Sequence, residues 1–334
     1  MIPTNLSKSV FSILLLASCS AFGADRDYDG RWDITVGDKL RGKALWEEYD
    51  KIGADQRGLV WWLEVEGAGT PTPKGQFVTA YRGDVNVIEQ IAVHDGELVF
   101  GFVRDNRKLI YKARIMKGKL EGTFQIADQK RPPISWTGVR APVINDKDDG
   151  TWREGKRFAL FNGKDLSGWR PAMADVVPIG WEVKDGLLVL TGSGSENNLV
   201  SEEKFWNFEL HVEFKPGPKT NSGIGLRARY EVQILEDLGR PTSNHGNGAL
   251  YGFIVPSENA SKPAGEWQAF DIRLVGRQVT VVLNGKTIIN KQEIPGLTAM
   301  AVDADEAEPG PILLQSARGP VAFRNIMLKT LVKK

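Results

Sequence analysis

Polar and charged side chains recur at every second position between residues 223 and 234. The odd positions hold Gly223, Gly225, Arg227, Arg229, Glu231 and Gln233, whereas the even positions hold Ile224, Leu226, Ala228, Tyr230, Val232 and Ile234. Side chains of a strand alternate between its two faces, so the pattern predicts one strand with a core face and a polar face. A carboxylate there could act as a general base, and cations or amides could bind an oxyanion. The two glycines on the polar face would leave room for a ligand.

Two polar loops follow this segment. Residues 236–252 contain His245 and Tyr251, and residues 256–268 contain Lys262, Glu266 and Trp267. Sites are commonly formed by loops that a rigid scaffold positions, so both loops are candidates to complete one. Two alternatives stay open here: His245 is either an acid/base group or a plain surface residue, and Trp267 is either a sugar-stacking platform or part of the core.

Two other polar segments carry weaker signals. Residues 208–214 also alternate, with Glu209, His211 and Glu213 on one side, and this pattern favours a solvated outer face. Residues 303–308 are acidic, but Ala307 and Glu308 stand where a calcium loop needs a ligand and a glycine, which favours a solvated acidic loop. No GxSxG, Walker or HExxH motif is present in the sequence.

Composition excludes several classes of protein. The 334 residues include 43 basic and 42 acidic side chains, a net charge of +1, whereas a dedicated nucleic-acid binder would show a basic excess. A single cysteine excludes a disulfide framework and any multi-cysteine metal site. We therefore expect neither a nucleic-acid partner nor a nucleotide cofactor.

The N-terminal segment is typical of an export signal. A short apolar run from Val10 to Ala17 follows Lys8 and is too short to span a bilayer. Two processing sites are open: a lipobox ending at Cys19, which would leave residues 1–18 as the signal, or cleavage after Gly23, which would leave residues 1–23. We therefore expect an exported protein, either periplasmic or an outer-membrane lipoprotein whose lipid anchor is its one contact with the membrane.

The remaining chain is expected to be all-β. Residues 24–145 show short alternating stretches, with a strand at residues 61–65 and a hairpin turn at Lys117 and Gly118, and they predict a small barrel-like domain with one helical turn in residues 40–51. Residues 142–156 read as a polar linker. Longer strands follow in residues 155–330, at 187–190, 208–214, 223–234, 270–275, 279–283 and 321–328, and predict two antiparallel sheets packed as a sandwich.

The C-terminal half resembles the 3-keto-disaccharide hydrolase domain family, also described as 3-keto-glucoside 1,2-lyase/3-keto-2-hydroxy-glucal hydratase domains. The resemblance covers about residues 155–330. It begins at residues 158–169 (FALFNGKDLSGW) and continues, in order, through residues 221–224, 226–227, 230–235, 248–252, 265–267 and 283–285. It implies a concanavalin-like jelly-roll sandwich and an enzyme that cleaves 3-keto-glucosides or 3-keto-disaccharides, by β-elimination, by hydration of the 2-hydroxy-glucal, or by both.

This implied chemistry needs a base, an acid and groups that bind an enediolate. Glu231 and His245 are the candidates for the acid/base pair, and the same two residues are candidate ligands of a divalent metal. The candidate substrate-binding residues are Asn221, Arg227, Gln233, Tyr251, Lys262 and Trp267. The alternative is a non-catalytic carbohydrate-binding sandwich of the cell envelope, because one fold serves both roles.

The two processing sites lead to different locations of the mature protein. If Cys19 is lipidated, the Cys19→Ala variant should move from the membrane fraction to the soluble fraction on cell fractionation, because the lipid anchor would be lost. An unchanged distribution would instead indicate cleavage after Gly23.

Overall fold

The computed structural model describes residues 25–36, 60–78, 85–88, 90–104, 107–127, 132–172, 179–190, 197–316 and 318–334. Its regular elements are strands, apart from one 3-10 turn, η1 (Asp25–Tyr28), which confirms the all-β class. The expected signal segment with Cys19, and the helical turn expected in residues 40–51, lie outside the described residues. Within the described residues, no helix has both the length and the apolar character needed to cross a membrane.

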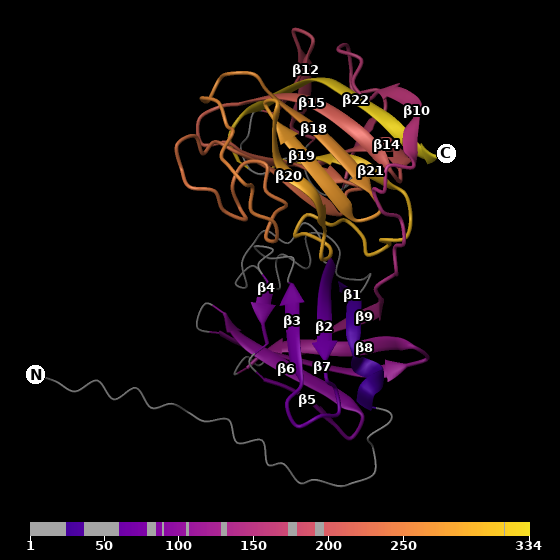
Figure 1. Ribbon diagram of the computed structural model, residues 1–334. Helices are drawn as coiled ribbons and strands as arrows, with labels where there is room; N and C mark the ends of the chain where they lie inside the picture. Colours follow the sequence, from indigo (N-terminus) through magenta and orange to yellow (C-terminus); the bar gives the residue numbers. More distant parts are fainter. Residues whose placement is uncertain are drawn as a thin grey trace, which may run out of the picture.

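The N-terminal strands form a single curled antiparallel sheet, which we call the barrel (Figure 1). The first and last strands pair with each other, Trp32 opposite Arg140, so the meander closes on itself and its remaining gap lies between β4 and β5. There Ile91 of β5 approaches Gly75 of β3. The strands are β1 (Gly30–Val36), β2 (Val60–Glu66), β3 (Lys74–Val78), β4 (Val85–Val87), β5 (Gln90–His94), β6 (Glu97–Arg104), β7 (Arg107–Met116), β8 (Lys119–Ile126) and β9 (Ile134–Arg140).

Aromatic side chains fill the barrel. Trp61, Phe77, Phe100, Tyr111 and Phe124 pack on one another with ring centroids 4.8–6.3 Å apart. The hairpin predicted at Lys117 and Gly118 is confirmed: both residues have positive φ, 51° and 76°, as in the turns that match the twist of paired strands. The predicted strand at residues 61–65 is confirmed as part of β2.

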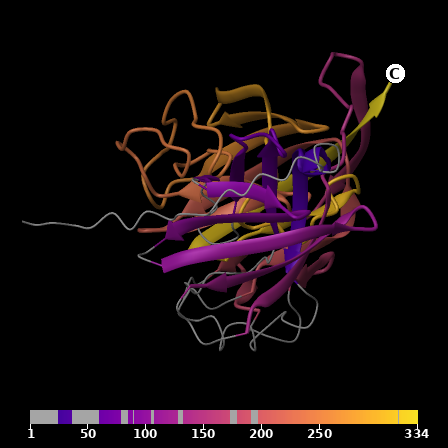
Figure 2. The same cartoon turned by 90° about the horizontal axis from the view of Figure 1, so that it is seen from below.

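The C-terminal strands form a sandwich of two sheets, shown above the barrel in Figure 1 and behind it in Figure 2. The larger sheet runs β12-β13-β22-β15-β18-β19-β20, with β10 also paired to β22, and the smaller sheet runs β11-β14-β21-β16-β17. The strands are β10 (Trp152–Ala159), β11 (Trp169–Pro171), β12 (Trp181–Lys184), β13 (Leu187–Leu190), β14 (Leu199–Phe205), β15 (Phe208–Pro216), β16 (Asn221–Leu226), β17 (Tyr230–Leu235), β18 (Gln268–Val275), β19 (Gln278–Leu283), β20 (Lys286–Glu293), β21 (Gly310–Leu314) and β22 (Val321–Lys333). The predicted sandwich is therefore confirmed.

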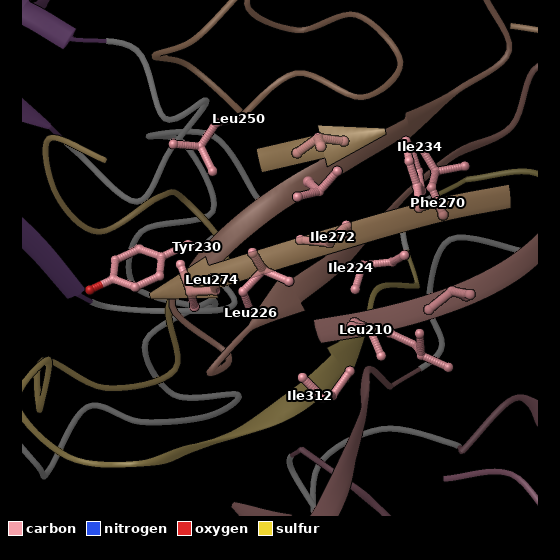
Figure 3. Close-up of a cluster of buried hydrophobic side chains, with 14 of the residues drawn as sticks. Leu210, Ile224, Leu226, Tyr230, Ile234, Leu250, Phe270, Ile272, Leu274 and Ile312 are labelled. Atoms are coloured by element: carbon pink, nitrogen blue, oxygen red, sulfur yellow. The ribbon is translucent and has the colours of Figure 1, made fainter. Parts of the chain in front are cut away.

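The core of the sandwich lies between its two sheets. Ile224, Leu226 and Ile234 of the smaller sheet meet Leu210 and Ile272 of the larger one, and all five side chains are buried (Figure 3). The outer face of the larger sheet carries partly exposed polar pairs, such as His211 Nδ1 with Asp271 Oδ1 at 2.7 Å. The solvated face expected for residues 208–214 is thus confirmed.

The prediction of one strand over residues 223–234 is wrong, because the segment forms a hairpin of two strands. β16 and β17 pair with Leu226 opposite Tyr230, and the three residues between them form the turn. Arg227 and Ala228 adopt positive φ, 54° and 53°, although neither is a residue that usually marks such a turn. Because residues 226 and 230 face each other, the even positions of the two strands still point into the core. The exception is Ala228 in the turn, which packs with Met300 and Leu313 instead.

The predicted linker is bound along the edge of the sandwich. Asp146 Oδ2 accepts from Trp206 Nε1 and Asn207 Nδ2, both at 2.8 Å, and Asp148 pairs with Arg273 at 3.0 Å. The last residues of the predicted linker, from Trp152 on, are already strand β10. The barrel interior forms its own hydrophobic cluster, whereas Val60, Trp62 and Val78 on the outside of the barrel pack into the cluster of the sandwich. We propose that the two halves are two domains joined through residues 143–154.

The Asp148–Arg273 pair predicts a pH-dependent contribution to stability. Burial raises the pKa of the Asp148 carboxyl, but the hydrogen bonds and charge of Arg273 and the charge of Lys291 outweigh burial and hold the pKa below its ordinary value. Asp148→Asn should lower the free energy of unfolding at neutral pH by about 1–3 kcal/mol, because hydrogen bonds to charged groups are worth that much.

A lowered native pKa gives stability that is present above the ordinary aspartate pKa and is lost as pH falls through the native value. The gap between Asp148→Asn and the parent should therefore narrow below about pH 4 in urea unfolding. Asp185→Asn is the matched control, since Asp185 is an exposed residue in the turn between β12 and β13. A gap of constant size at every pH would contradict this assignment.

Candidate active site

Glu231 and Gln233 lie on the outer face of the smaller sheet, opposite two glycines. In the β16–β17 hairpin, Gly225 pairs with Glu231 and Gly223 pairs with Gln233. A Cβ atom built on Gly223 would lie 2.5 Å from Oε1 of Glu231. The space at Gly223 is therefore occupied by the Glu231 side chain, which is 2% exposed, and the space at Gly225 is occupied by Met300 and Leu313. The expectation that the glycines leave this space open for a ligand is corrected accordingly.

The amide of Gln233 supports the carboxylate. In the orientation that satisfies its hydrogen bonds, the amide nitrogen donates to the Ser222 carbonyl at 2.8 Å and to Glu231 Oε1 at 3.2 Å. In the opposite orientation, the amide nitrogen instead donates to Asn221 Oδ1 at 3.5 Å and to the His245 carbonyl oxygen at 3.4 Å. The Gln233 amide thus lies beside three of the other predicted site residues, Glu231, Asn221 and His245.

The loop of residues 236–252 folds back along β17. Gln233 N donates to Ala249 O at 2.9 Å, and Tyr251 N donates to Glu231 O at 3.0 Å. The His245 ring packs edge-on against the Tyr251 ring, with centroids 4.6 Å apart. The structure therefore brings together Asn221, Glu231, Gln233, His245 and Tyr251, which sequence reasoning had assigned to one site.

The second predicted loop supports the first. Asp237 Oδ2 accepts from Asn247 N at 2.8 Å, and Asp237 Oδ1 accepts from Ser261 Oγ at 2.9 Å, so residues of the 256–268 loop hold the loop that carries His245. Lys262 itself is exposed, and its ammonium group donates to the carbonyl of Trp267 at 3.2 Å. The second loop therefore supports the position of the first, and the described contacts of the Lys262 side chain lie within its own loop.

Two predicted binding residues lie elsewhere. The ring of Trp267 stacks against Arg324, 3.9 Å from the guanidinium carbon to the centroid, with Lys215 at 5.0 Å, on the outer face of the larger sheet. Arg227 is in the hairpin turn, where Nε donates to Trp206 O at 2.8 Å, and burial lowers its pKa to about 10. The turn breaks the predicted row of charges, which is why Arg227 does not share the face of Glu231.

Sequence reasoning missed the cover of this face. The connection from β20 to β21, residues 294–309, lies over the hairpin and is named the β20–β21 loop here. Thr298 Oγ1 accepts from Glu231 N at 3.0 Å, and a Cβ on Gly225 would meet Met300 Sδ at 2.7 Å. Gln315, whose N–H donates to Gly223 O, buries its side-chain oxygen without a hydrogen-bond partner among the described residues. These residues come from distant parts of the chain, and no local motif marks them.

The acidic part of the same loop is only partly solvated, whereas a solvated loop was expected. Asp305 and Glu308 are exposed, but Glu306 is fully buried, and its carboxylate accepts from the Tyr230 hydroxyl at 2.7 Å. Asp303 pairs with Arg229 at 2.5 Å. Glu306 and Asp303 therefore fix the loop to β17 and its turn.

The arrangement suits proton transfer at a covered carboxylate. Glu231 is an acceptor held by an amide, and His245 on the adjacent loop carries an imidazole, a common acid/base group in catalysis. Within the described residues, no group of three or more His, Cys, Asp or Glu side chains converges as a metal centre would require. For the predicted metal role, the described chain therefore offers Glu231 and His245 as two donors.

The fit between Gly223 and Glu231 is testable by substitution. Gly223→Ala should displace the Glu231 carboxylate and lower the free energy of unfolding by about 1–3 kcal/mol, because the new methyl group overpacks a filled site. Gly225→Ala is the matched control, because its methyl group meets Met300 and Leu313 instead. Crystal structures of both variants should show a moved carboxylate only in Gly223→Ala, and an unmoved one there would refute the proposed fit.

Comparison with known proteins agrees with the resemblance seen in the sequence. The chain is 27% identical over 226 residues to the 3-keto-disaccharide hydrolase of Bacteroides thetaiotaomicron, covering 52% of this chain and 78% of that protein. Two candidate glycosyl hydrolases of known structure from Parabacteroides distasonis are 28% and 24% identical, with TM-scores of 0.45 and 0.43; the matches cover 61% and 53% of this chain and 94% of each of those chains. Residues 156–329 match the model of the 3-keto-alpha-glucoside-1,2-lyase-like domain, and the chain belongs to this family.

Proposed function

We propose that this protein is an exported enzyme that cleaves 3-keto-glucosides or 3-keto-disaccharides, with Glu231 and His245 as its acid/base pair. Family membership and the likeness to a 3-keto-disaccharide hydrolase support a carbohydrate-cleaving enzyme. The apolar run after Lys8 supports export. The observation that carries the choice of residues is the covered Glu231 carboxylate, bonded to Gln233 beneath the loop of His245 and Tyr251.

The proposed reaction begins with removal of a proton from C2 of the sugar. The ketone at C3 acidifies this proton, the Glu231 carboxylate accepts it, and the electrons of the C–H bond form an enediolate across C2 and C3. Collapse of the enediolate makes the C1–C2 double bond and breaks the C1–O bond, and His245 donates a proton to the departing oxygen. Addition of water at C1, with return of a proton to C2, completes a net hydrolysis.

The polar groups around Glu231 have separate tasks in this proposal. The Gln233 amide holds the carboxylate in place, and the Asn221 amide lies beside the same Gln233 amide. The side-chain oxygen of Gln315 has no hydrogen-bond partner among the described residues, so it is an acceptor for a sugar hydroxyl, since a buried acceptor without a partner is costly. The half-buried ring of Tyr251 offers an apolar face to the sugar ring.

The alternative is a sandwich that binds carbohydrate without cleaving it. Such a module needs aromatic platforms, and one candidate, the ring of Trp267, lies under Arg324 on the other sheet. A binding module also has no need of a covered carboxylate beside a histidine. The geometry on the smaller sheet therefore favours the enzyme.

The acid/base assignment predicts large rate losses from small substitutions. Glu231→Gln keeps the size of the side chain and removes its charge, and it should lower kcat on a 3-keto-glucoside by roughly 10²–10⁴-fold without unfolding the protein. Glu236→Gln, which alters a partly exposed carboxylate one residue beyond β17, is the matched control and should keep full activity. His245→Asn should also lose activity, whereas His211→Asn on the other sheet should not.

Isotope and chelator experiments separate the possible roles. Cleavage in D₂O should place deuterium at C2 of the hydrated product, because the proton removed from C2 exchanges with solvent. Loss of activity on chelation would assign Glu231 and His245 to metal binding, and insensitivity would assign them to proton transfer. Full activity of Glu231→Gln, or a product without deuterium at C2, would overturn the mechanism, and sugar binding without turnover would favour the alternative.

A further inference from the structure

The barrel contacts the β20–β21 loop directly before Thr298. Trp62, on the outer face of β2, donates from Nε1 to Leu297 O at 3.1 Å. A Cβ on Gly296 would lie 2.7 Å from the same nitrogen, so the indole lies directly against the loop backbone. The ring also stacks with Phe253 of the sandwich, with centroids 6.0 Å apart. One side chain of the barrel thus fixes the two residues that precede Thr298.

Arg31 of β1 makes a second contact with the same loop. Its guanidinium donates to Pro295 O and pairs with the buried carboxylate of Glu306. Figure 3 shows the Tyr230 hydroxyl, the other partner of Glu306, pointing away from the aliphatic core. A buried carboxylate is destabilising unless it is paired, and in the described chain the cation paired with Glu306 is Arg31. The sandwich therefore contains a charge that only the barrel neutralises there.

The segment that these two residues hold is the cover of the candidate site. Thr298 N donates to Arg229 O at 3.0 Å, Val302 N donates to Ala228 O at 3.0 Å, and Thr298 Oγ1 accepts from Glu231 N. Thr298 is thus bonded to the β16–β17 hairpin and is one residue from Leu297, which Trp62 holds. A shift of residues 295–297 would be transmitted directly to the backbone of Glu231.

We infer that the barrel is a positioning element of the site on the sandwich: Trp62 and Arg31 hold residues 295–298 against β17 so that the backbone of Glu231 stays in place. The inference rests on the proposed function only for its kinetic consequence. It gives the N-terminal half of the chain a task that the family match, confined to residues 156–329, leaves unassigned.

Hydrogen exchange of the full-length protein tests the inference without using activity. Trp62→Phe keeps an aromatic ring beside Phe253 and removes the hydrogen bond to Leu297. It should make exchange of the Thr298 and Val302 amides about five-fold faster, the factor expected for one net hydrogen bond. Trp61→Phe is the matched control: Trp61 is the neighbouring residue, but its ring packs inside the barrel against Phe77 and Phe124. Equal exchange in the two variants would overturn the inference.

A second hydrogen-exchange test removes the charge of Arg31 and then that of Glu306. Arg31→Met leaves Glu306 unpaired and should also speed exchange across residues 295–303, whereas adding Glu306→Gln should restore protection because the unpaired charge on the loop is then removed. Asp33, the other buried partner of Arg31, lies in the barrel and is the same in both variants. An Arg31→Met variant with parental exchange would count against the inference.

In kinetics, Trp62→Phe should lower kcat on a 3-keto-glucoside more than it changes KM, and an equal fall in Trp61→Phe would also count against it. If the parent protein does not cleave 3-keto-glucosides, the proposed function fails and the exchange result still decides the inference.

Discussion

The turn between β16 and β17 is the constraint on which the candidate site depends. Arg227 and Ala228 occupy the left-handed region there, which costs roughly 1–2 kcal/mol for each non-glycine residue. The buried guanidinium of Arg227 offsets this cost by bonding to Trp206 and Asn207 and by stacking over the Trp206 ring at 3.7 Å. Gly310 lets the turn pack closely, since a Cβ there would lie 2.3 Å from the Arg227 carbonyl. A turn of another length would shift the register and send Glu231 to the core face.

The fixed register explains how the Glu231 carboxylate is shielded from water and still has a hydrogen-bond donor beside it. Glu231 lies opposite glycines, so its side chain has space, and Gln233 supplies a donor on the same face. The β20–β21 loop then closes the face through Thr298 and Met300. A group that is held by hydrogen bonds and shielded from water is preorganised, and such preorganisation is the usual requirement of an acid/base site.

The junction between the barrel and the sandwich combines aromatic and ionic contacts. Trp62 and Phe253 provide apolar contact, and Arg31, Asp33 and Glu306 provide buried charges. Burial raises the pKa of Asp33 to about 6, although the charges of Arg31 and Arg277 oppose this shift. Buried ion pairs add little net stability because both charges lose their hydration, but they disfavour any arrangement that separates the partners. The charges therefore fix how the two halves dock more than how tightly they do so.

The sequence by itself determined the all-β class, the sandwich, the barrel hairpin at Lys117 and Gly118, and which residues of β16 and β17 face the core. These properties follow from alternation with period two and from local turn chemistry, which neighbouring residues encode. It also selected Glu231, Gln233, His245, Tyr251 and Asn221, since they flank one strand and its following loop.

Only the tertiary structure decided which charged residues share the site. The turn at Arg227 has no local signal because its support comes from Trp206, Asn207 and Gly310, which are distant in sequence. Trp267 was assigned to the site because it lies in the second polar loop, but its ring packs on the other sheet. The acidic residues around Glu306 predicted a solvated loop, but the Glu306 side chain is buried. Its burial depends on Tyr230 and on Arg31, which lies 275 positions earlier in the sequence. Contacts over such separations arise from packing, and packing leaves no periodic trace in the sequence.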